Sequence, residues 1–183
     1  PDRTFYFVME LLQGTDLESL VRRFGPQSPA RTVYLLRQAC SSLAEAHSAG
    51  LVHRDIKPAN LYLCRCGLEH DFVKVLDFGL VKRDPALGPE ETMLTAPNTA
   101  TGTPAYIAPE MVSNTPVDRR ADLYALGCVG YWLLTGQLVF EADNALRMLV
   151  HHINTEPVPP SVRLGRALPP SLEAVILSCL RKD

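Results

Sequence analysis

The chain has 183 residues, 46% of them hydrophobic and 21% charged, and 18 basic against 20 acidic residues leave a net charge of −2. This composition excludes a disordered or collagen-like chain, and the length corresponds to about one compact domain. The balanced charge gives no reason to expect binding to nucleic acid or to an anionic membrane. The most apolar stretch, residues 123–134, is shorter than the roughly 20 residues that a membrane-spanning helix needs.

The cysteine count bears on compartment and on metal binding. Five cysteines, an odd number, argue against a disulfide framework and favour a reducing compartment. Cys64 and Cys66 lie two positions apart, but a zinc site would need a second cluster, and the other cysteines occur singly in apolar patterns. We therefore expect small buried or hairpin thiols.

The N-terminal part predicts one strand and two helices. The apolar and aromatic run at residues 5–12 predicts a buried strand, and Thr15 and Asp16 offer a cap for a short helix over residues 17–24. Ser28, followed by a proline, begins a longer helix that ends at a glycine. The buried face of that longer helix is predicted to carry Val33, Leu36, Cys40, Leu43 and His47.

Little helical period is found in the middle of the chain. Residues 52–60 break both periodicities and predict a loop, and residues 61–63 and 72–76 predict short strands around a turn at Gly67. The segment 77–110 is proline-containing and irregular. A long irregular stretch inside a compact domain is usually functional.

Three helices are predicted in the C-terminal part, the first and most apolar over residues 121–134. An amphipathic helix follows, and after a proline-rich segment at residues 157–170 a last helix begins with Ser171 as its cap. The inward-facing residues of the last two helices are predicted to be Leu146, Leu149, Val150 and Ile153, then Leu172, Val175, Ile176, Cys179 and Leu180.

One loop concentrates the chemistry. Residues 53–60 read His-Arg-Asp-Ile-Lys-Pro-Ala-Asn, which brings Asp55, Lys57 and Asn60 close together. Phosphoryl transfer from a polyphosphate needs an acid to orient the nucleophile, a cation to offset charge, and an oxygen ligand for magnesium. Asp77, which opens Asp-Phe-Gly after the next predicted strand, supplies a second hard oxygen ligand.

Three motifs in their order and spacing resemble the protein kinase catalytic domain, specifically its larger C-terminal lobe. They are residues 53–60, the Asp-Phe-Gly at residues 77–79, and Gly-Thr-Pro-Ala-Tyr-Ile-Ala-Pro-Glu at residues 102–110. The resemblance implies a mainly α fold with a few short strands. It divides the chain, as a partial kinase domain over residues 1–183, into a hinge (5–14), a catalytic loop (53–60), an activation segment (77–110) and a helical remainder (111–183).

The resemblance also assigns roles. Asp55 is expected to orient the substrate hydroxyl, Lys57 to neutralise charge on the transferred phosphoryl group, and Asn60 and Asp77 to hold Mg²⁺ for ATP. Lys57 in this loop, together with Thr103, which looks like the threonine that bridges Asp55 and Lys57, favours a serine/threonine kinase that acts on protein substrates.

The nucleotide-binding residues are implied by the same resemblance. Met9 is expected to guard the back of the adenine pocket, the backbones of Glu10 and Leu12 to face the adenine edge, and Asp16 to meet the ribose. Tyr62 stands where the family often has a leucine beneath the adenine.

Arg54, beside the catalytic aspartate, is typical of kinases that are switched by phosphorylation of the activation segment. Thr99 is the favoured phosphosite, and Thr95 and Thr101 are its rivals. The structural residues implied by the family are His53, Arg54, Phe78, Gly79, Glu110 and Asp122. Asp122 is expected to tie down the backbone of the turn at His53 and Arg54.

The glycine-rich loop, strand lysine and helix glutamate of the small N-terminal lobe are not found in the sequence. We expect a truncated chain that is inactive alone. The alternatives are a pseudokinase or scaffold that binds partners without catalysis, and a small-molecule phosphotransferase of related fold. The hairpin region resembles bacterial, eukaryotic-like serine/threonine kinases, which implies a cytoplasmic domain, in some cases attached to a membrane anchor, and dimerisation for autophosphorylation in trans.

Overall fold

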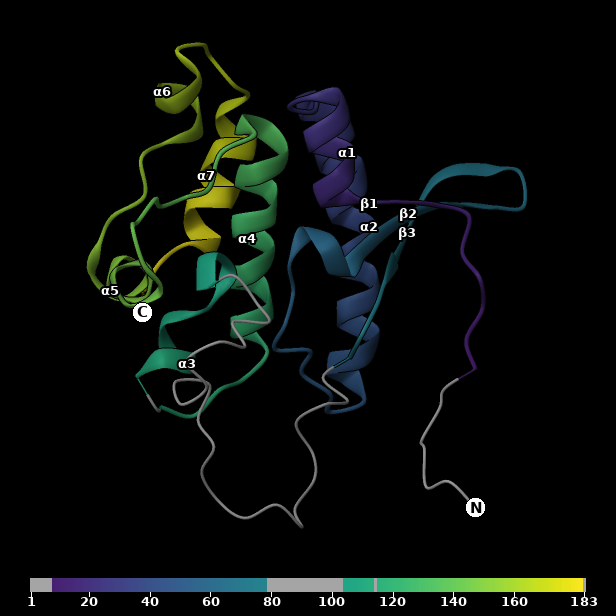
Figure 1. The fold of residues 1–183 in the computed structure, drawn as a ribbon, viewed down its shortest axis with the longest axis horizontal. Coiled ribbons are helices and arrows are strands. Elements are labelled where there is room, and N and C mark those ends of the chain that lie inside the picture. The colour runs from purple at the N-terminus through teal and green to yellow at the C-terminus, as the bar shows by residue number, and fades with distance from the viewer. Residues whose placement is uncertain (1–7, 79–103, 114, 183) are drawn as a thin grey trace.

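The computed structural model describes residues 8–78, 104–113 and 115–182. Predictions for Gly79, Thr95, Thr99, Thr101 and Thr103 therefore lie outside the described residues. Within them the chain is mainly helical and carries one small sheet, as the sequence predicted (Figure 1). No helix among these residues is both long and apolar enough to cross a membrane.

The sheet has three antiparallel strands in the order β1-β2-β3. They are β1 (Gly14–Asp16), β2 (Leu61–Cys66) and β3 (Glu69–Val75). The prediction of a buried strand at residues 5–12 is wrong over residues 8–12, which have no regular structure and expose Val8, Met9 and Leu11. An apolar run forms a buried strand only where a neighbouring strand can pair with it, and pairing with β2 begins at Gly14.

Helices α1 (Leu17–Phe24) and α2 (Pro29–Ser48) begin at the predicted caps. Asp16 accepts a hydrogen bond of 2.8 Å from the Ser19 backbone N–H, which satisfies one of the free donors at the start of α1. The buried face of α2 differs from the prediction. Leu43 is on it, but the other fully buried positions are Thr32, Leu35 and Ala39.

Val33 and Cys40 are exposed, so the buried stripe of α2 lies beside the predicted one. The helix contacts both β3 and helix α4 (Arg120–Thr135), and two contacts on different sides widen and shift the face that is buried. Spacing alone gave the period of the pattern but not its phase.

Helix α4 lies between helices α1 and α2 on one side and the C-terminal helices on the other (Figure 1). It contributes residues to two hydrophobic cores. Its Val129 and Leu133 join the core formed with α1, α2 and the sheet, whereas Tyr131 and Leu134 join the core formed with the C-terminal helices. The helices of this second region are α3 (Pro109–Val112), α5 (Ala145–Asn154), α6 (Pro160–Leu164) and α7 (Pro170–Cys179).

Three details of these C-terminal helices differ from the sequence prediction. Helix α7 begins after Pro169 rather than at a Ser171 cap, and its Val175 is exposed. In α5, Leu146 and Val150 are exposed. The residues buried from α5 are instead Met148, Leu149 and His152.

Candidate active site

The catalytic loop is anchored by a fully buried carboxylate from α4. Asp122 accepts hydrogen bonds from the backbone N–H groups of His53 (2.9 Å) and Arg54 (2.8 Å), and the His47 ring lies 2.8 Å from the same carboxylate. Arg54 has a φ of 66°, an unfavourable value for a residue with a side chain. Such a conformation persists where its surroundings determine it, and the two bonds to Asp122 do so.

His53 joins this loop to the end of β3. Its Nε2 atom lies 2.8 Å from the Leu76 carbonyl oxygen, and its Nδ1 atom is 3.2 Å from the Asp55 backbone nitrogen. A carbonyl only accepts and a backbone N–H only donates, so the ring is neutral with its proton on Nε2. The Phe78 ring packs against it with centroids 4.7 Å apart.

Asp55, Lys57 and Asn60 converge on one oxygen atom. The Oδ2 atom of Asp55 accepts hydrogen bonds from Lys57 Nζ at 2.9 Å and from Asn60 Nδ2 at 3.1 Å. Asn60 Nδ2 also donates to the Asp55 backbone carbonyl at 2.8 Å. Oδ2 is occupied and the carboxylate is 43% exposed. Oδ1 has no hydrogen-bond partner among the described residues, so it is the oxygen that can accept a further hydrogen bond.

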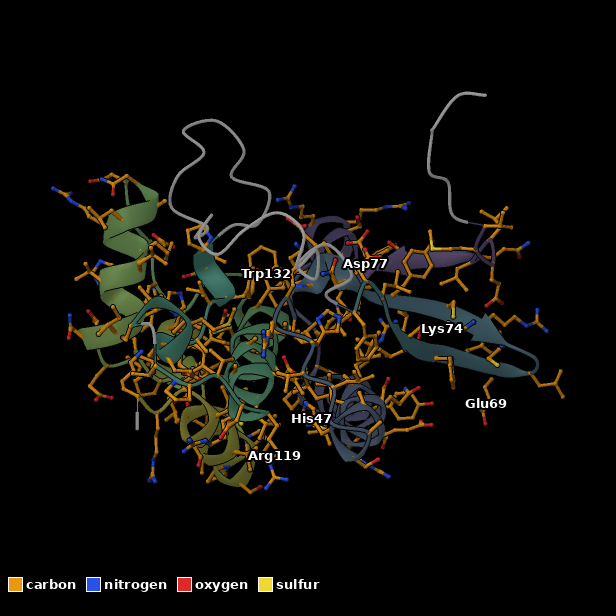
Figure 2. All side chains as sticks on the ribbon, turned by 90° about the horizontal axis from the view of Figure 1, so that it is seen from below. His47, Glu69, Lys74, Asp77, Arg119 and Trp132 are labelled. Atoms are coloured by element: carbon orange, nitrogen blue, oxygen red, sulfur yellow. The ribbon has the colours of Figure 1, made fainter. Side chains whose placement is uncertain are left out.

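Asp77 is brought to this loop by a backbone hydrogen bond. The Leu76 N–H donates to the Asn60 carbonyl at 2.9 Å. Asp77, the next residue, therefore lies close to the end of the loop. Figure 2 shows Asp77 beyond the end of β3, with Lys74 further back along that strand. Asp77 is exposed and has a φ of 59°.

The chemistry of these donors fits magnesium. The Asn60 amide nitrogen is engaged by Asp55, so its side-chain oxygen is the atom it presents, and Asp77 adds a carboxylate. Mg²⁺ prefers hard oxygen ligands and is commonly held by one or two side chains together with phosphate and water. Among the described residues, no group of three or more His, Cys, Asp or Glu side chains could hold a metal ion.

The residues predicted to meet the nucleotide lie in two places. Asp16 and Tyr62 are cross-strand partners in the β1–β2 pair, so the structure brings these two together. Asp16 already accepts from the Ser19 N–H and hydroxyl, each at 2.8 Å. Met9 and Glu10 are in the exposed segment before β1.

Two contacts near the site were missed by the sequence reasoning. Lys74 of β3 pairs with Glu10, and the hydrogen bond that its ammonium group donates to the Glu10 carboxylate raises the pKa of Lys74. His47, which the sequence places on the buried face of its helix without a role, contacts Asp122. Neither pairing has a local signal, because the partners are separated by 64 and 75 positions. Glu110, expected to be structural, lies in the first turn of α3.

Comparison with known proteins gives the family. The family model for the protein kinase domain matches residues 1–183, so the chain belongs to the protein kinase family. Its relatives include serine/threonine-protein kinase pkn3 of Myxococcus xanthus, 40% identical over 183 residues, and PknB of Mycobacterium tuberculosis (strain H37Rv), 36% identical over 178 residues. These matches cover 100% and 97% of the chain, but only 33% and 27% of the two relatives.

A solved structure shows the same fold. The crystal structure of Rad53 1-466 in complex with AMP-PNP matches with a TM-score of 0.75 and 27% identity. The match covers 96% of this chain and 41% of the Rad53 chain. Both relatives named above are called serine/threonine-protein kinases.

Proposed function

We propose that this chain is the substrate- and magnesium-binding part of a serine/threonine protein kinase that transfers the γ-phosphoryl group of Mg-ATP to a protein hydroxyl. The observation that carries the proposal is the arrangement at Asp55. One carboxylate oxygen is engaged by Lys57 and Asn60, and the other, which has no hydrogen-bond partner among the described residues, is available to a hydroxyl. The kinase relatives support the reaction class.

In this mechanism Asp55 orients the serine or threonine hydroxyl through Oδ1 and accepts its proton as the hydroxyl attacks phosphorus. Lys57 lies 2.9 Å from Asp55 Oδ2, where its ammonium group offsets negative charge that develops on the transferred group. The contribution of the chain is alignment and electrostatic stabilisation, without a covalent intermediate on the protein.

Asn60 and Asp77 are the residues that would hold Mg²⁺, which supplies charge neutralisation for the phosphate oxygens when bound. The hydrogen bond from the Leu76 N–H to the Asn60 carbonyl holds together the two segments that carry Asn60 and Asp77. Met9, Glu10, Leu12, Asp16 and Tyr62 remain the proposed nucleotide-facing residues. Asp16 can bind a ribose hydroxyl only in addition to its capping bonds to Ser19, since both of its oxygens already accept one hydrogen bond.

Regulation is proposed to run through Arg54. A phosphate on Thr99, Thr95 or Thr101 would pair with its guanidinium group and so couple phosphorylation of the activation segment to the catalytic loop. Mass spectrometry of phosphopeptides from the autophosphorylated protein identifies which threonine is used. A phosphate-independent activity in alanine variants at all three positions would contradict this part of the proposal.

The Asp55→Asn exchange in the full-length protein tests the reaction. It keeps the size of the side chain but removes the base, so we expect kcat for a serine- or threonine-containing protein substrate to fall by at least about 100-fold. Asp143→Asn is the matched control, because that carboxylate is exposed and, within the part of the chain that the structure describes, pairs only with Arg147 one helical turn away. Unchanged phosphorylation by Asp55→Asn would favour the pseudokinase or scaffold alternative.

We further propose that the 183-residue chain has little kinase activity when expressed alone. Its sequence does not contain the glycine-rich loop and the lysine that hold the phosphates in kinases. The purified 183-residue chain is expected to transfer no measurable radioactive phosphate to a generic protein substrate. Robust transfer would overturn the proposal.

A further inference from the structure

The segment at residues 8–13, most of which is exposed, is joined to the sheet by one charged contact. Lys74, labelled on β3 in Figure 2, donates a hydrogen bond of 2.5 Å from Nζ to Glu10 Oε2, across 64 positions of sequence. In the part of the chain that the structure describes, this is the one side-chain hydrogen bond that the segment makes. The ion pair therefore restrains the segment before its pairing with β2 begins at Gly14.

Lys74 stands at the end of a row of residues that crosses all three strands. Asp16 of β1 is the cross-strand partner of Tyr62 in β2, and Tyr62 is in turn the partner of Lys74 in β3. Directly opposed residues of antiparallel strands point to the same face of a sheet. Leu61 and Leu63, which alternate with Tyr62, are buried in the hydrophobic core, so the row lies on the other face.

This row connects the ion pair to the proposed nucleotide site. Asp16 and Tyr62 are two of the residues proposed to meet the nucleotide, and the backbone of Glu10 is proposed to face the adenine edge. Lys74 binds Glu10 from the face of the sheet that carries Asp16 and Tyr62. The ion pair therefore holds the segment before β1 on the side of the sheet where the other nucleotide-facing residues lie.

We propose that Lys74 is a positioning residue for the nucleotide, whose ion pair with Glu10 holds the segment before β1 in the conformation that presents its backbone to the adenine edge. Lys74 acts through Glu10 and does not itself contact the nucleotide. The inference rests on the proposed function, because it concerns the nucleotide site of that reaction. It adds to this site a residue of β3 that no motif in the sequence marks.

The exposure of the pair sets the size of the expected effect. The Lys74 side chain is 32% exposed and that of Glu10 is 70% exposed, and ion pairs of this kind contribute little to the stability of a fold. A segment that is already held in its bound conformation loses less freedom when the ligand binds, so the restraint favours binding. We expect loss of the pair to weaken nucleotide affinity about 2- to 5-fold.

A double-mutant cycle tests the inference by calorimetric titration of the full-length protein with Mg²⁺ and a non-hydrolysable ATP analogue. Lys74→Met and Glu10→Gln should each raise the Kd about 2- to 5-fold. The double variant should bind no more weakly than either single variant, because each change breaks the same ion pair. In steady-state kinetics, Lys74→Met should raise KM for ATP by a similar factor with little effect on kcat.

Arg65→Met is the matched control. Arg65 is an exposed cation of the same hairpin, and its Nε atom donates to the Gly67 carbonyl rather than to the segment before β1. The Kd of this variant should equal that of the parent. An equal rise of the Kd in Arg65→Met and Lys74→Met would overturn the inference, because the effect would then come from the charge of the hairpin as a whole.

The two substitutions also separate positioning from direct attraction of the polyphosphate. Lys74→Met removes a positive charge and Glu10→Gln removes a negative one, so a purely Coulombic effect on the nucleotide would have opposite signs in the two variants. Under the proposed role both variants bind more weakly. Tighter binding by Glu10→Gln would overturn the inference, and so would single-variant effects that multiply in the double variant.

A measurement without nucleotide follows the segment itself. The ¹⁵N heteronuclear NOEs of residues 9–12 should fall in Lys74→Met and stay unchanged in Arg65→Met, because the restraint is lost only in the former. Normal binding by the parent with an unchanged Kd in Lys74→Met would overturn this inference alone. Absence of nucleotide binding by the parent protein would overturn the proposed function together with it, so the two failures are distinguishable.

Discussion

The catalytic loop and the segment before β1 carry the same proposed nucleotide site, yet they are held in opposite ways. Buried groups hold the loop in place. Asp122 and His53 are fully buried, and the Asp122 carboxylate accepts hydrogen bonds from the backbone N–H groups of His53 and Arg54, nearly 70 positions away in sequence. Residues 8–13 are largely exposed, and among the described residues their side chains make one ion pair, between Glu10 and Lys74.

The catalytic loop combines two kinds of residue: those proposed to act on the substrate, and the buried residues that position them. Asp55 and Lys57 are partly accessible, as groups that meet a substrate must be, whereas Asn60 is buried beside them. The geometry of all three is imposed by inaccessible neighbours. A buried hydrogen bond is costly to break because the remaining partner stays unsatisfied. An exposed ion pair is cheaply replaced by water. The two regions should therefore respond very differently to substitution.

The largest effect is expected at Asp122. Asp122→Ala leaves the His53 and Arg54 backbone N–H groups and the His47 ring without their buried acceptor, so we expect unfolding free energy to fall by about 3 kcal/mol or more. Urea denaturation followed by the fluorescence of Trp132, the single tryptophan, measures it. Asp118→Ala is the control, because that exposed carboxylate bonds mainly to nearby Arg120. Equal losses in both variants would contradict the comparison.

Lowering the pH should destabilise the fold through the buried His152 side chain. The pKa of His152 is about 4 in the folded chain, against about 6.5 when exposed, so the unfolded chain binds more protons between these values. The stabilisation is present above pH 6.5 and is lost as pH falls toward 4, by up to about 3 kcal/mol. As pH is lowered across this range, the urea midpoint of the His152→Phe variant should fall less than that of the parent. If the midpoints of the two proteins fall in parallel with pH, His152 does not account for the loss of stability.

A close helix contact gives an intermediate effect. A Cβ atom at Gly127 of α4 would lie 2.7 Å from Cys179 Cβ of α7, whereas one at Gly130 would meet the flexible end of Leu36 at 3.0 Å. We expect Gly127→Ala to destabilise by about 1–3 kcal/mol and Gly130→Ala by less, because Leu36 can rotate. Thermal unfolding of the pair measures the order, and a larger loss at Gly130 would show that α7 yields more easily than α2.

The sequence predicted what depends on local pattern. The caps at Asp16 and Ser28 and the turn at Gly67 follow from short-range chemistry, and the structure confirms them. The motif at residues 53–60 placed Asp55, Lys57 and Asn60 in one loop because they are neighbours in the chain, and the structure joins their side chains by hydrogen bonds.

What could not be predicted depends on partners far away in sequence. The phase of the buried stripe on α2 is decided by contacts with both β3 and α4. Residues 8–12 have the composition of a strand but no strand beside them among the described residues. The network of Tyr124, His152 and Lys182 joins residues up to 58 positions apart, and no spacing in the sequence signals it.

The smallest effect is expected at the exposed ion pair. Lys74→Met removes the partner of Glu10 but leaves no buried group unsatisfied, since both side chains reach solvent. We expect the urea midpoint to stay within experimental scatter of the parent, and the same for Glu10→Gln. If the pair serves nucleotide binding, Lys74→Met should instead change the affinity for an ATP analogue measured by calorimetry in the full-length protein. A loss of stability approaching that of Asp122→Ala would mean that this segment is held as firmly as the catalytic loop, and the contrast between the two regions would fail.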